Sequence, residues 1–246
     1  MSVVAITGGT HGIGRAIAEL ASERGHAVAV CSRSVRDSSL PSKISHVKTD
    51  VRHREEVNQF VQSVKEKHGR LDVFINCAGD SRWKTLEAID EAFISELIET
   101  NVLGTLWGCA AAASCMGPGG AIVNLSSLAG KRGSANNSAY CAAKFAVNGI
   151  TQALAKELGP RGIRINAVCP VYVRTEKILA ALSEPASPAA GQGVEPYLKG
   201  FAAAQTALGR LPSAREVAEV VLFLAGSAAS AITGQCINVD CGTLPQ

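Results

Sequence analysis

The chain has 246 residues, of which 47% are hydrophobic and 18% are charged, and this apolar content excludes an intrinsically disordered protein. Its formal net charge is only +3 and it has no run of like charges, which argues against a nucleic-acid partner. Its apolar runs are shorter than the roughly 18–20 residues of a membrane-spanning helix, and the first residues lack the basic segment of a secretory signal. We therefore expect a soluble cytoplasmic protein, with no membrane partner, that forms one domain over residues 1–246.

Short apolar runs alternate with amphipathic stretches along the whole chain. Seven runs are typical of strands buried on both faces, and they lie at 3–7, 27–32, 47–49, 71–76, 120–125, 163–168 and 237–239. The periodicity predicts helices at 13–24, 55–67, 90–115, 138–158 and 213–224, with a short helical segment at 86–88. Buried strands separated by helices predict an α/β protein with a doubly wound Rossmann fold, in which helices cover both faces of a parallel seven-stranded sheet.

Residues 182–199 depart from this alternation. The segment is rich in Pro, Ser, Ala and Gly, and it has no clean periodicity. It is either a disordered insert or a mobile lid. We favour a substrate lid over about 176–205, because long loops in compact domains tend to be functional.

Eight cysteines are spread along the chain, and none forms a Cys-x-x-Cys pair or has zinc-ligand spacing to a histidine. They stand at positions 31, 77, 109, 115, 141, 169, 236 and 241. Buried thiols in a reducing compartment explain this distribution better than a disulfide framework does. The sequence therefore predicts no metal site.

A glycine-rich turn, TGGTHGIG at 7–14, joins the first predicted strand to the first predicted helix. Gly8 permits a tight reversal, Gly12 lets the backbone approach a pyrophosphate, and Gly14 lets the helix pack against the strand. The N-terminus of the helix offers unpaired N–H groups and a partial positive charge to the anion. The predicted dinucleotide contacts of this turn are Gly8, Thr10, His11, Gly12, Ile13 and Gly14.

Ser32 and Arg33 end the second predicted strand, where NAD-binding proteins usually carry an Asp or Glu for the ribose. A carboxylate would repel the 2′-phosphate of NADP, whereas a guanidinium binds it bidentately. We therefore expect NADP(H) to be preferred over NAD(H), with Ser32 and Arg33 at the phosphate. Arg15 and Arg36 are alternative phosphate ligands, and Arg33 as a solvated surface residue is the non-functional alternative.

Asp50 and Val51 follow the third predicted strand. Because the ends of parallel strands share one edge of the sheet, this pair is a candidate contact for the adenine. Asp50 alone is equally typical of a residue that caps the next helix.

Tyr140 and Lys144 stand four residues apart in a predicted helix, which places both side chains on one face. A neighbouring ammonium, together with an oxidised nicotinamide, would lower the pKa of the phenol from about 10 toward the operating pH. The phenol would then suit general acid–base catalysis. The alternative is a tyrosine that packs on the lysine stem.

These motifs, in this order, resemble the short-chain dehydrogenase/reductase family from Val3 to Gly242. The matching segments are TGGTHGIG at 7–14, DV at 50–51, NCAG at 76–79, Asn101, NLSS at 124–127, YCAAK at 140–144, CPVYVRT at 169–175 and TGQCINVDCG at 233–242. The resemblance implies an oxidoreductase that transfers a hydride to or from a nicotinamide.

The resemblance also implies a role for each matching residue. Ser127, thirteen residues before Tyr140, would hydrogen-bond the substrate carbonyl, and Tyr140 would donate or accept the proton. Lys144 would lower the pKa of Tyr140 and hold the nicotinamide ribose. Asn101 would anchor a water relay to the lysine; the alternative is an asparagine satisfied inside a helix. The other implied cofactor contacts are Asn76, Ala78, Gly79, Pro170, Val173 and Thr175.

Three positions depart from the family pattern without removing a catalytic group. Cys77 stands where the family has a second Asn, and Val171 stands where the Pro-Gly pair has its glycine. Val171 therefore brings a side chain toward the nicotinamide. Cys241 interrupts the C-terminal Asp-Gly-Gly, which we expect to alter subunit contacts.

The sequence favours an NADPH-dependent reductase of a 3-oxoacyl thioester or a similar moderately apolar ketone. A sugar or polyol dehydrogenase is the alternative, and a catalytically silent dinucleotide-binding protein is a weaker one. For a carrier-bound thioester, a basic rim is expected from Arg82, Lys84, Lys131 and Arg132; Lys131 and Arg132 are alternatively solvated charges. The Ala-rich faces of the two long helices favour a homotetramer, with a dimer second.

Overall fold

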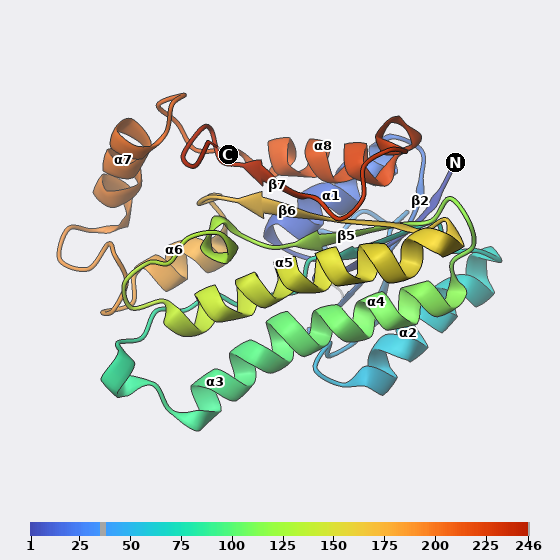
Figure 1. Ribbon diagram of the computed structural model, residues 1–246, viewed down its shortest axis with the longest axis horizontal. Helices are drawn as coiled ribbons and strands as arrows, with labels where there is room; N and C mark the ends of the chain where they lie inside the picture. Colours follow the sequence, from blue (N-terminus) through green and yellow to red (C-terminus); the bar gives the residue numbers. More distant parts are fainter. Residues whose placement is uncertain (35–37, 246) are drawn as a thin grey trace.

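The computed structural model describes residues 1–34 and 38–245, and one sheet of parallel strands lies at its centre (Figure 1). Within this described part the strand order is β3-β2-β1-β4-β5-β6-β7. The strands are β1 (Val3–Thr7), β2 (Ala27–Ser32), β3 (Ser45–Lys48), β4 (Val73–Asn76), β5 (Ala121–Leu125), β6 (Arg164–Pro170) and β7 (Cys236–Val239). The predicted doubly wound α/β fold is therefore confirmed.

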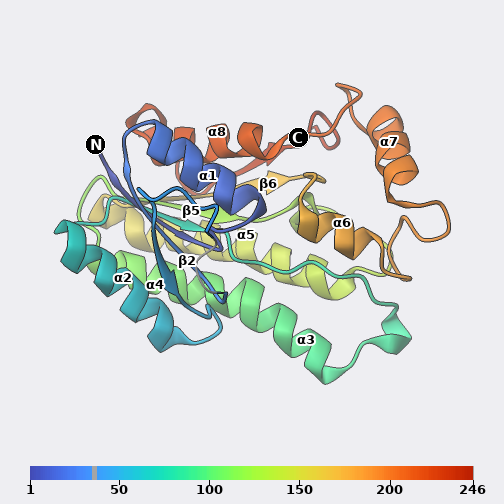
Figure 2. The same ribbon diagram turned by 180° about the vertical axis from the view of Figure 1, so that it is seen from behind.

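Helices cover both faces of the sheet. Helices α1 and α8 pack against each other on one face, while α2, α4 and α5 cover the opposite face, as the two opposed views show (Figure 1, Figure 2). The helices are α1 (Gly12–Glu23), α2 (Arg54–His68), α3 (Glu91–Ile98), α4 (Gly104–Cys115), α5 (Ser138–Leu158), α6 (Glu176–Leu182), α7 (Val194–Gln205) and α8 (Ala214–Ala225).

The central strand β1 shows why its sequence is apolar without interruption. Val4 and Ile6 pack into the core beneath α1 and α8, whereas Val3 and Ala5 pack into the core beneath α2 and α4. Successive side chains of a strand point to opposite faces, so a strand covered on both sides must be apolar at every position. All five residues of β1 are buried.

The segment predicted as one helix from Asp90 to about Cys115 is three consecutive helical pieces. Asp90 caps α3 by accepting a hydrogen bond from the Phe93 amide at 2.8 Å. A π-helical turn at Glu99–Leu103 then joins α3 to α4. Such turns insert one extra residue into a helix and are frequent at functional sites. Asn101 lies in this turn and is fully buried.

The segment at 182–199 is folded, although its sequence shows no period. It contains the end of α6, a series of turns and the start of α7, which project beyond the sheet (Figure 1). Leu182, Ala189 and Leu198 are buried against Trp83 in a small separate cluster. The sequence missed these helices because the segment is rich in Pro, Gly and Ser and lacks a clean apolar period, and because part of its packing comes from Trp83, far away in the sequence.

The order of the strands determines where a site can form. From the central pair, the sheet extends through β1, β2 and β3 in one direction and through β4, β5, β6 and β7 in the other. In open parallel sheets, ligands bind outside the carboxyl ends of the strands at this reversal. The glycine-rich turn follows β1, and the segment at 77–79 follows β4, so both lie at this point.

Candidate active site

The glycine-rich turn after β1 is held closely against two neighbouring strands. The Gly8 amide donates a hydrogen bond to the Cys31 carbonyl at 2.8 Å, and Gly8 adopts a φ of +68°. A Cβ atom at Gly8 would lie 2.8 Å from Ala78 Cα, and one at Gly14 would lie 2.2 Å from the Gly8 carbonyl oxygen. Only glycine fits these two positions, which confirms the expected tight reversal and close helix packing.

Gly12 and the first turn of α1 form an open cradle. Gly12 has a φ of +54°, and a Cβ atom there would lie 3.1 Å from Thr175 Cγ2. His11 precedes α1 and gives the helix no side-chain cap; its Nδ1 lies 2.8 Å from Thr10 Oγ1. The first amides of α1 therefore face the cradle without a capping side chain, which is the arrangement that binds a pyrophosphate.

The end of β2 carries the residues expected to bind the 2′-phosphate of NADP. Arg33 is exposed there, and Ser32 Oγ lies 2.9 Å from His46 Nε2. Arg15, an alternative ligand, contacts Glu19 at 2.8 Å and donates to Ser39 Oγ at 2.7 Å. Arg36, the other alternative, lies outside the described residues.

Asp50 and Val51 lie beside the same edge of the sheet. Burial raises the pKa of Asp50, but hydrogen bonds from Arg52, 2.6 Å away, outweigh burial and hold this pKa below its usual value. The N-cap of α2 is His53, so the alternative of Asp50 as the cap of this helix is wrong. Val51 is buried, and its Cγ2 lies 2.9 Å from the position of a Cβ at Gly104.

Asn76 ends β4, but its side chain belongs to the core beneath the helices. Its Nδ2 donates to Asn124 Oδ1 at 2.9 Å, and Asn124 in turn donates to Thr151 Oγ1 at 3.0 Å. The expected contact between Asn76 and the adenosine ribose is therefore restricted to its main chain. The alternation along β4 was the signal for this, because Asn76 points to the same face as the buried Phe74.

The segment after Asn76 lies against the glycine-rich turn and Lys144. Thr7 Oγ1 accepts hydrogen bonds from the Cys77 and Ala78 amides, each at 3.1 Å, which fixes this segment beside β1. A Cβ atom at Gly79 would lie 2.9 Å from Asn101 Oδ1 and 3.5 Å from Lys144 Nζ. The glycine therefore gives Asn101 and Lys144 room to approach each other.

Asn101 is anchored by the segment that follows β4. Its Nδ2 donates to the carbonyls of Asp80 and Leu97, both at 3.0 Å, and its Oδ1 accepts from the Asp80 amide at 3.3 Å. The side chain is thus satisfied within the protein. Asn101 is therefore a hydrogen-bonded helical residue close to Gly79 and Lys144, and the water relay to the lysine stays a prediction.

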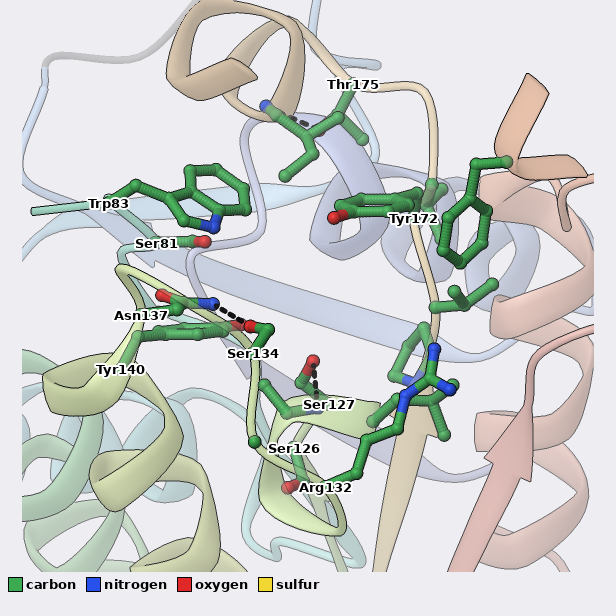
Figure 3. A pocket seen from close by; sticks show the side chains of 18 of the residues that line it. Ser81, Trp83, Ser126, Ser127, Arg132, Ser134, Asn137, Tyr140, Tyr172 and Thr175 are labelled. Carbon is green, nitrogen blue, oxygen red and sulfur yellow. Dashed lines mark hydrogen bonds between the residues drawn. The ribbon is translucent and has the colours of Figure 1, made fainter. Parts of the chain in front are cut away.

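Ser127 and Tyr140 line one cavity of about 200 Å³ (Figure 3). Ser127 lies at the end of the β5 segment, and its Oγ accepts a hydrogen bond from the Ala129 amide at 3.1 Å. Tyr140 lies in the first turn of α5. Four of the expected cofactor contacts line the same cavity: Ile13, Pro170, Val173 and Thr175. Val171, which replaces the glycine of the family pattern, lines it as well.

The ionisation of the tyrosine and the lysine differs from the expected pattern. Burial raises the pKa of Tyr140 to about 12, against the lowering effect of hydrogen bonds with Ser127 and Ser81. Burial lowers the pKa of Lys144 to about 8. Lys144 Nζ donates to the Leu125 carbonyl at 2.9 Å and lies 5.6 Å from the centroid of the Tyr140 ring. The ammonium thus lies over the ring rather than at the phenol oxygen, and the phenol is neutral at pH 7.

Several residues of the cavity were not expected from the sequence as site residues. Trp83 and Ser81 enter from the segment after β4, and Phe201 enters from α7. Tyr172 stacks edge-on against Phe201 at a centroid distance of 4.9 Å, and its hydroxyl lies 3.0 Å from that of Tyr197. Tyr172 lies inside the CPVYVRT segment and Phe201 lies inside the predicted lid at 176–205, whereas no sequence pattern pointed to Trp83.

The expected basic rim is not assembled. Arg82 contacts Glu96 at 2.6 Å, and Lys84 contacts Asp90 at 2.7 Å. Lys131 Nζ donates to the carbonyl of residue 236 at 2.7 Å. Arg132 alone of the four candidates lines the cavity.

All eight cysteines are free thiols. Burial raises the pKa of Cys31, Cys77 and Cys109 to about 12, so these thiols stay protonated and unreactive. Across residues 1–34 and 38–245, no group of His, Cys, Asp and Glu side chains has the arrangement of a metal site. In the same part of the chain, no helix has both the length and the apolar character needed to span a bilayer.

Comparison with known proteins identifies the family. A family model described as "Enoyl-(Acyl carrier protein) reductase" matches residues 8–243. The chain is 37% identical over 254 residues to diacetyl reductase, (S)-acetoin forming, of Staphylococcus aureus, which covers 98% of this chain and 96% of that protein. It is 34% identical over 250 residues to the 3-oxoacyl-(acyl-carrier-protein) reductase FabG of Chlamydia muridarum, with 96% and 95% covered.

A solved structure agrees with these relatives. Ligand-free aldohexose dehydrogenase of Thermoplasma acidophilum matches this chain with a TM-score of 0.89 at 30% identity, covering 100% of this chain and 97% of that one. The three named proteins thus act on different small or carrier-bound molecules within one fold. The chain belongs to the short-chain dehydrogenase/reductase family and is an oxidoreductase of the kind that binds a nicotinamide dinucleotide.

Proposed function

We propose that this protein is an NADPH-dependent reductase that converts a moderately apolar ketone into a secondary alcohol. The observation that carries the proposal is the convergence of the Ser127 and Tyr140 hydroxyls on one cavity, whose wall continues to Ile13 of the glycine-rich turn. This juxtaposition places a proton donor and an oxyanion-binding hydroxyl next to a dinucleotide cradle. A catalytically silent binding protein would not need it.

The residues present fit the dinucleotide. Three glycines keep the turn free of Cβ atoms. A Cβ at Gly8 or Gly14 would collide with the backbone, and one at Gly12 would fill the space beside Thr175. Thr10, His11 and Ile13 complete the turn, and Ala78, Gly79, Pro170, Val173 and Thr175 lie around it. When bound, the dinucleotide supplies the hydride. The chain supplies orientation, a proton and a site from which water is excluded.

The protonation states suit reduction. Tyr140 is a neutral phenol, because burial holds its pKa near 12. It donates its proton to the carbonyl oxygen as negative charge develops there, while the Ser127 hydroxyl donates a second hydrogen bond to the same atom. Lys144 has a pKa lowered to about 8, and its Nζ lies over the Tyr140 ring, 5.6 Å from the centroid. It therefore gains or loses a proton near neutral pH beside the phenol that donates the proton. Asn101 holds the backbone of Asp80 through two hydrogen bonds, beside the space at Gly79 into which Lys144 Nζ extends.

We assign the preference for NADPH to Arg33 and Ser32 at the end of β2. Arg33 is exposed, and its charge contributes to the low pKa of Asp50. The other two arginines at this edge are paired, Arg15 with Glu19 and Arg52 with Asp50. Arg33 is therefore the described cation at this edge that is best placed to bind a 2′-phosphate.

The cavity favours a small, moderately apolar substrate. Most of its lining is apolar or aromatic, and its volume is about 200 Å³. A 3-oxoacyl thioester remains within this class, although Arg82, Lys84 and Lys131 are committed to contacts elsewhere and do not form a docking rim for a carrier protein. Oxidation of a sugar or polyol is the second candidate, because four serine hydroxyls and the Asn137 amide also line the cavity.

Steady-state oxidation of NADPH and NADH with a panel of ketones, thioesters and aldoses tests the proposal. We expect turnover of ketones with NADPH at a higher kcat/KM than with NADH. Faster oxidation of polyols with NAD⁺ than reduction of any ketone would favour the second candidate. An absence of turnover with every substrate in both directions would contradict both.

We propose three further features of this protein. Helices α6 and α7 place Ile178 and Phe201 in the cavity wall, so we propose that the segment at about 176–205 acts as the substrate lid.

The layer formed by α3, α4 and α5 exposes Ile94 and Phe145, and we propose that it mediates assembly of a homotetramer. The free thiols favour a cytoplasmic location. Sedimentation of a single monomeric species would contradict the assembly.

A further inference from the structure

The cavity contains one charged side chain among the described residues that line it. Arg132 is half-buried in the wall, and every other lining residue is apolar, hydroxylated or an amide. Figure 3 shows its side chain rising past Ser127 toward the side of the cavity that carries Tyr172. The described lining of the cavity therefore carries one cationic side chain and no carboxylate.

The backbone of Arg132 is fixed, while its guanidinium has no protein partner in the described chain. Its amide donates to the Leu128 carbonyl at 3.0 Å, and its carbonyl lies within 4.0 Å of Cys141 Sγ. None of the ion pairs, side-chain hydrogen bonds or ring contacts of the described residues involves the guanidinium. Its positive charge opposes the rise in the pKa of Tyr172 that burial causes.

The neighbouring charges show that this isolation is specific to Arg132. Arg82 is paired with Glu96, Arg174 is paired with Glu195 at 2.6 Å, and no acidic side chain lines the cavity. A partly buried cation without a counter-ion is costly unless a ligand supplies the opposite charge. A planar guanidinium binds a carboxylate or a phosphate through two parallel hydrogen bonds.

We infer that the natural substrate carries an anionic group, a carboxylate or a phosphate, that Arg132 binds while the ketone oxygen meets Ser127 and Tyr140. This inference rests on the proposed reductase function and narrows its substrate to an oxo acid or an oxo phosphate. Trp83, Tyr172 and Phe201 then surround the apolar carbons between the two ends. Binding at both ends fixes which face of the ketone meets the hydride.

Three pairs of ketones, each with a charged and a neutral member, test this inference. The probes are 3-oxobutanoate with 3-oxobutanamide, 5-oxohexanoate with its amide, and dihydroxyacetone phosphate with dihydroxyacetone. For wild-type protein, we expect the charged member of at least one pair to have a kcat/KM about tenfold or more above its neutral partner. In Arg132→Gln this preference falls to near one, and in Arg132→Lys it is partly kept. The pair that responds identifies the anion as carboxylate or phosphate.

Arg215→Gln is the matched control, since it removes the same charge from an exposed ion pair with Glu23 outside the cavity. We expect this variant to keep the wild-type preference. An Arg132→Gln variant that is folded and keeps the full preference would overturn the inference, as would wild-type protein with no preference for any charged probe.

Binding measurements separate this inference from the proposed function. Calorimetry with Tyr140→Phe and NADPH measures the affinity of each probe without turnover. If the charged probes bind more tightly in a way that depends on Arg132, but wild-type protein does not reduce them, the anion site is supported and the reductase proposal is wrong. If ketones are reduced without any preference that depends on Arg132, the reductase proposal is supported and the anion site is wrong.

Discussion

Gly8→Ala tests whether the glycine-rich turn must pass this close to β4 to bind a dinucleotide. A Cβ atom at this position would lie 2.8 Å from Ala78 Cα and 2.9 Å from the Ala78 amide nitrogen, both of them backbone atoms that cannot rotate away. The φ of +68° adds strain, because the left-handed region costs a non-glycine residue roughly 1–2 kcal/mol. Overpacking adds about 1–3 kcal/mol.

Gly25→Ala is the matched control for this variant. Gly25 has a φ of +79°, but a Cβ atom there would have no neighbour within 4 Å. This variant should therefore suffer the strain alone, and at roughly 2–4 °C per kcal/mol its Tm should fall by about 2–8 °C.

Thermal unfolding and a fluorescence titration with NADPH measure the two consequences. The Tm of Gly8→Ala should fall further than that of Gly25→Ala, and its Kd for NADPH should rise by about tenfold or more. Gly25→Ala should bind NADPH like the wild type. Equal Tm values and equal NADPH affinities for the two variants would refute the reasoning that the turn is packed to its limit for cofactor binding.

Three further variants test other parts of the site. Arg33→Ala should weaken NADPH binding roughly 10- to 100-fold, as for loss of a charge-assisted hydrogen bond, and leave NADH binding unchanged; an equal loss for both cofactors would show that Arg33 does not read the phosphate. Asn124→Ala should lower the free energy of unfolding by about 3 kcal/mol, measured by urea denaturation, because Asn76 and Thr151 lose buried partners; a change below ~1 kcal/mol would contradict this. Lys144→Met should remove a pH dependence of the free energy of unfolding. The pKa of Lys144 is about 8 in the folded state and higher in the unfolded state, so the unfolded state binds more protons above pH 8. The free energy of unfolding of the wild type should therefore increase as the pH rises from 8 toward 10. Urea denaturation at pH 7 and pH 10 should show that the variant lacks this gain, and identical pH profiles would contradict it.

The fold was predictable because its central strands carry a simple pattern. Parallel strands covered on both faces must be apolar throughout, and β1 and β5 are read directly from such runs. Helices α6 and α7 were not predictable, because Pro, Gly and Ser residues interrupt the apolar period of this segment and its buried residues pack on Trp83, which lies far away in the sequence. The π-helical turn at Glu99–Leu103 was also invisible to the periodicity, which continues from α3 into α4.

The sequence indicated which residues form the candidate site, but it did not show how their side chains are oriented. The spacing of Tyr140 and Lys144 places both on one helix face, yet it does not show that Lys144 Nζ extends to the Leu125 carbonyl. The order of motifs indicated Asn76, but the pleat of β4 turns its side chain into the core. Arg132 was one of four equivalent basic residues until the tertiary structure showed that the other three have partners.

The central claim is that the Tyr140 hydroxyl donates the proton to the reduced ketone. Single-turnover oxidation of bound NADPH by a ketone substrate tests it most directly, with wild-type protein and Tyr140→Phe compared at the same cofactor saturation. The phenylalanine variant should bind NADPH with an unchanged Kd and lose about 10²- to 10⁴-fold in rate, the contribution typical of a general acid. A variant that oxidises NADPH at the wild-type rate would contradict the claim.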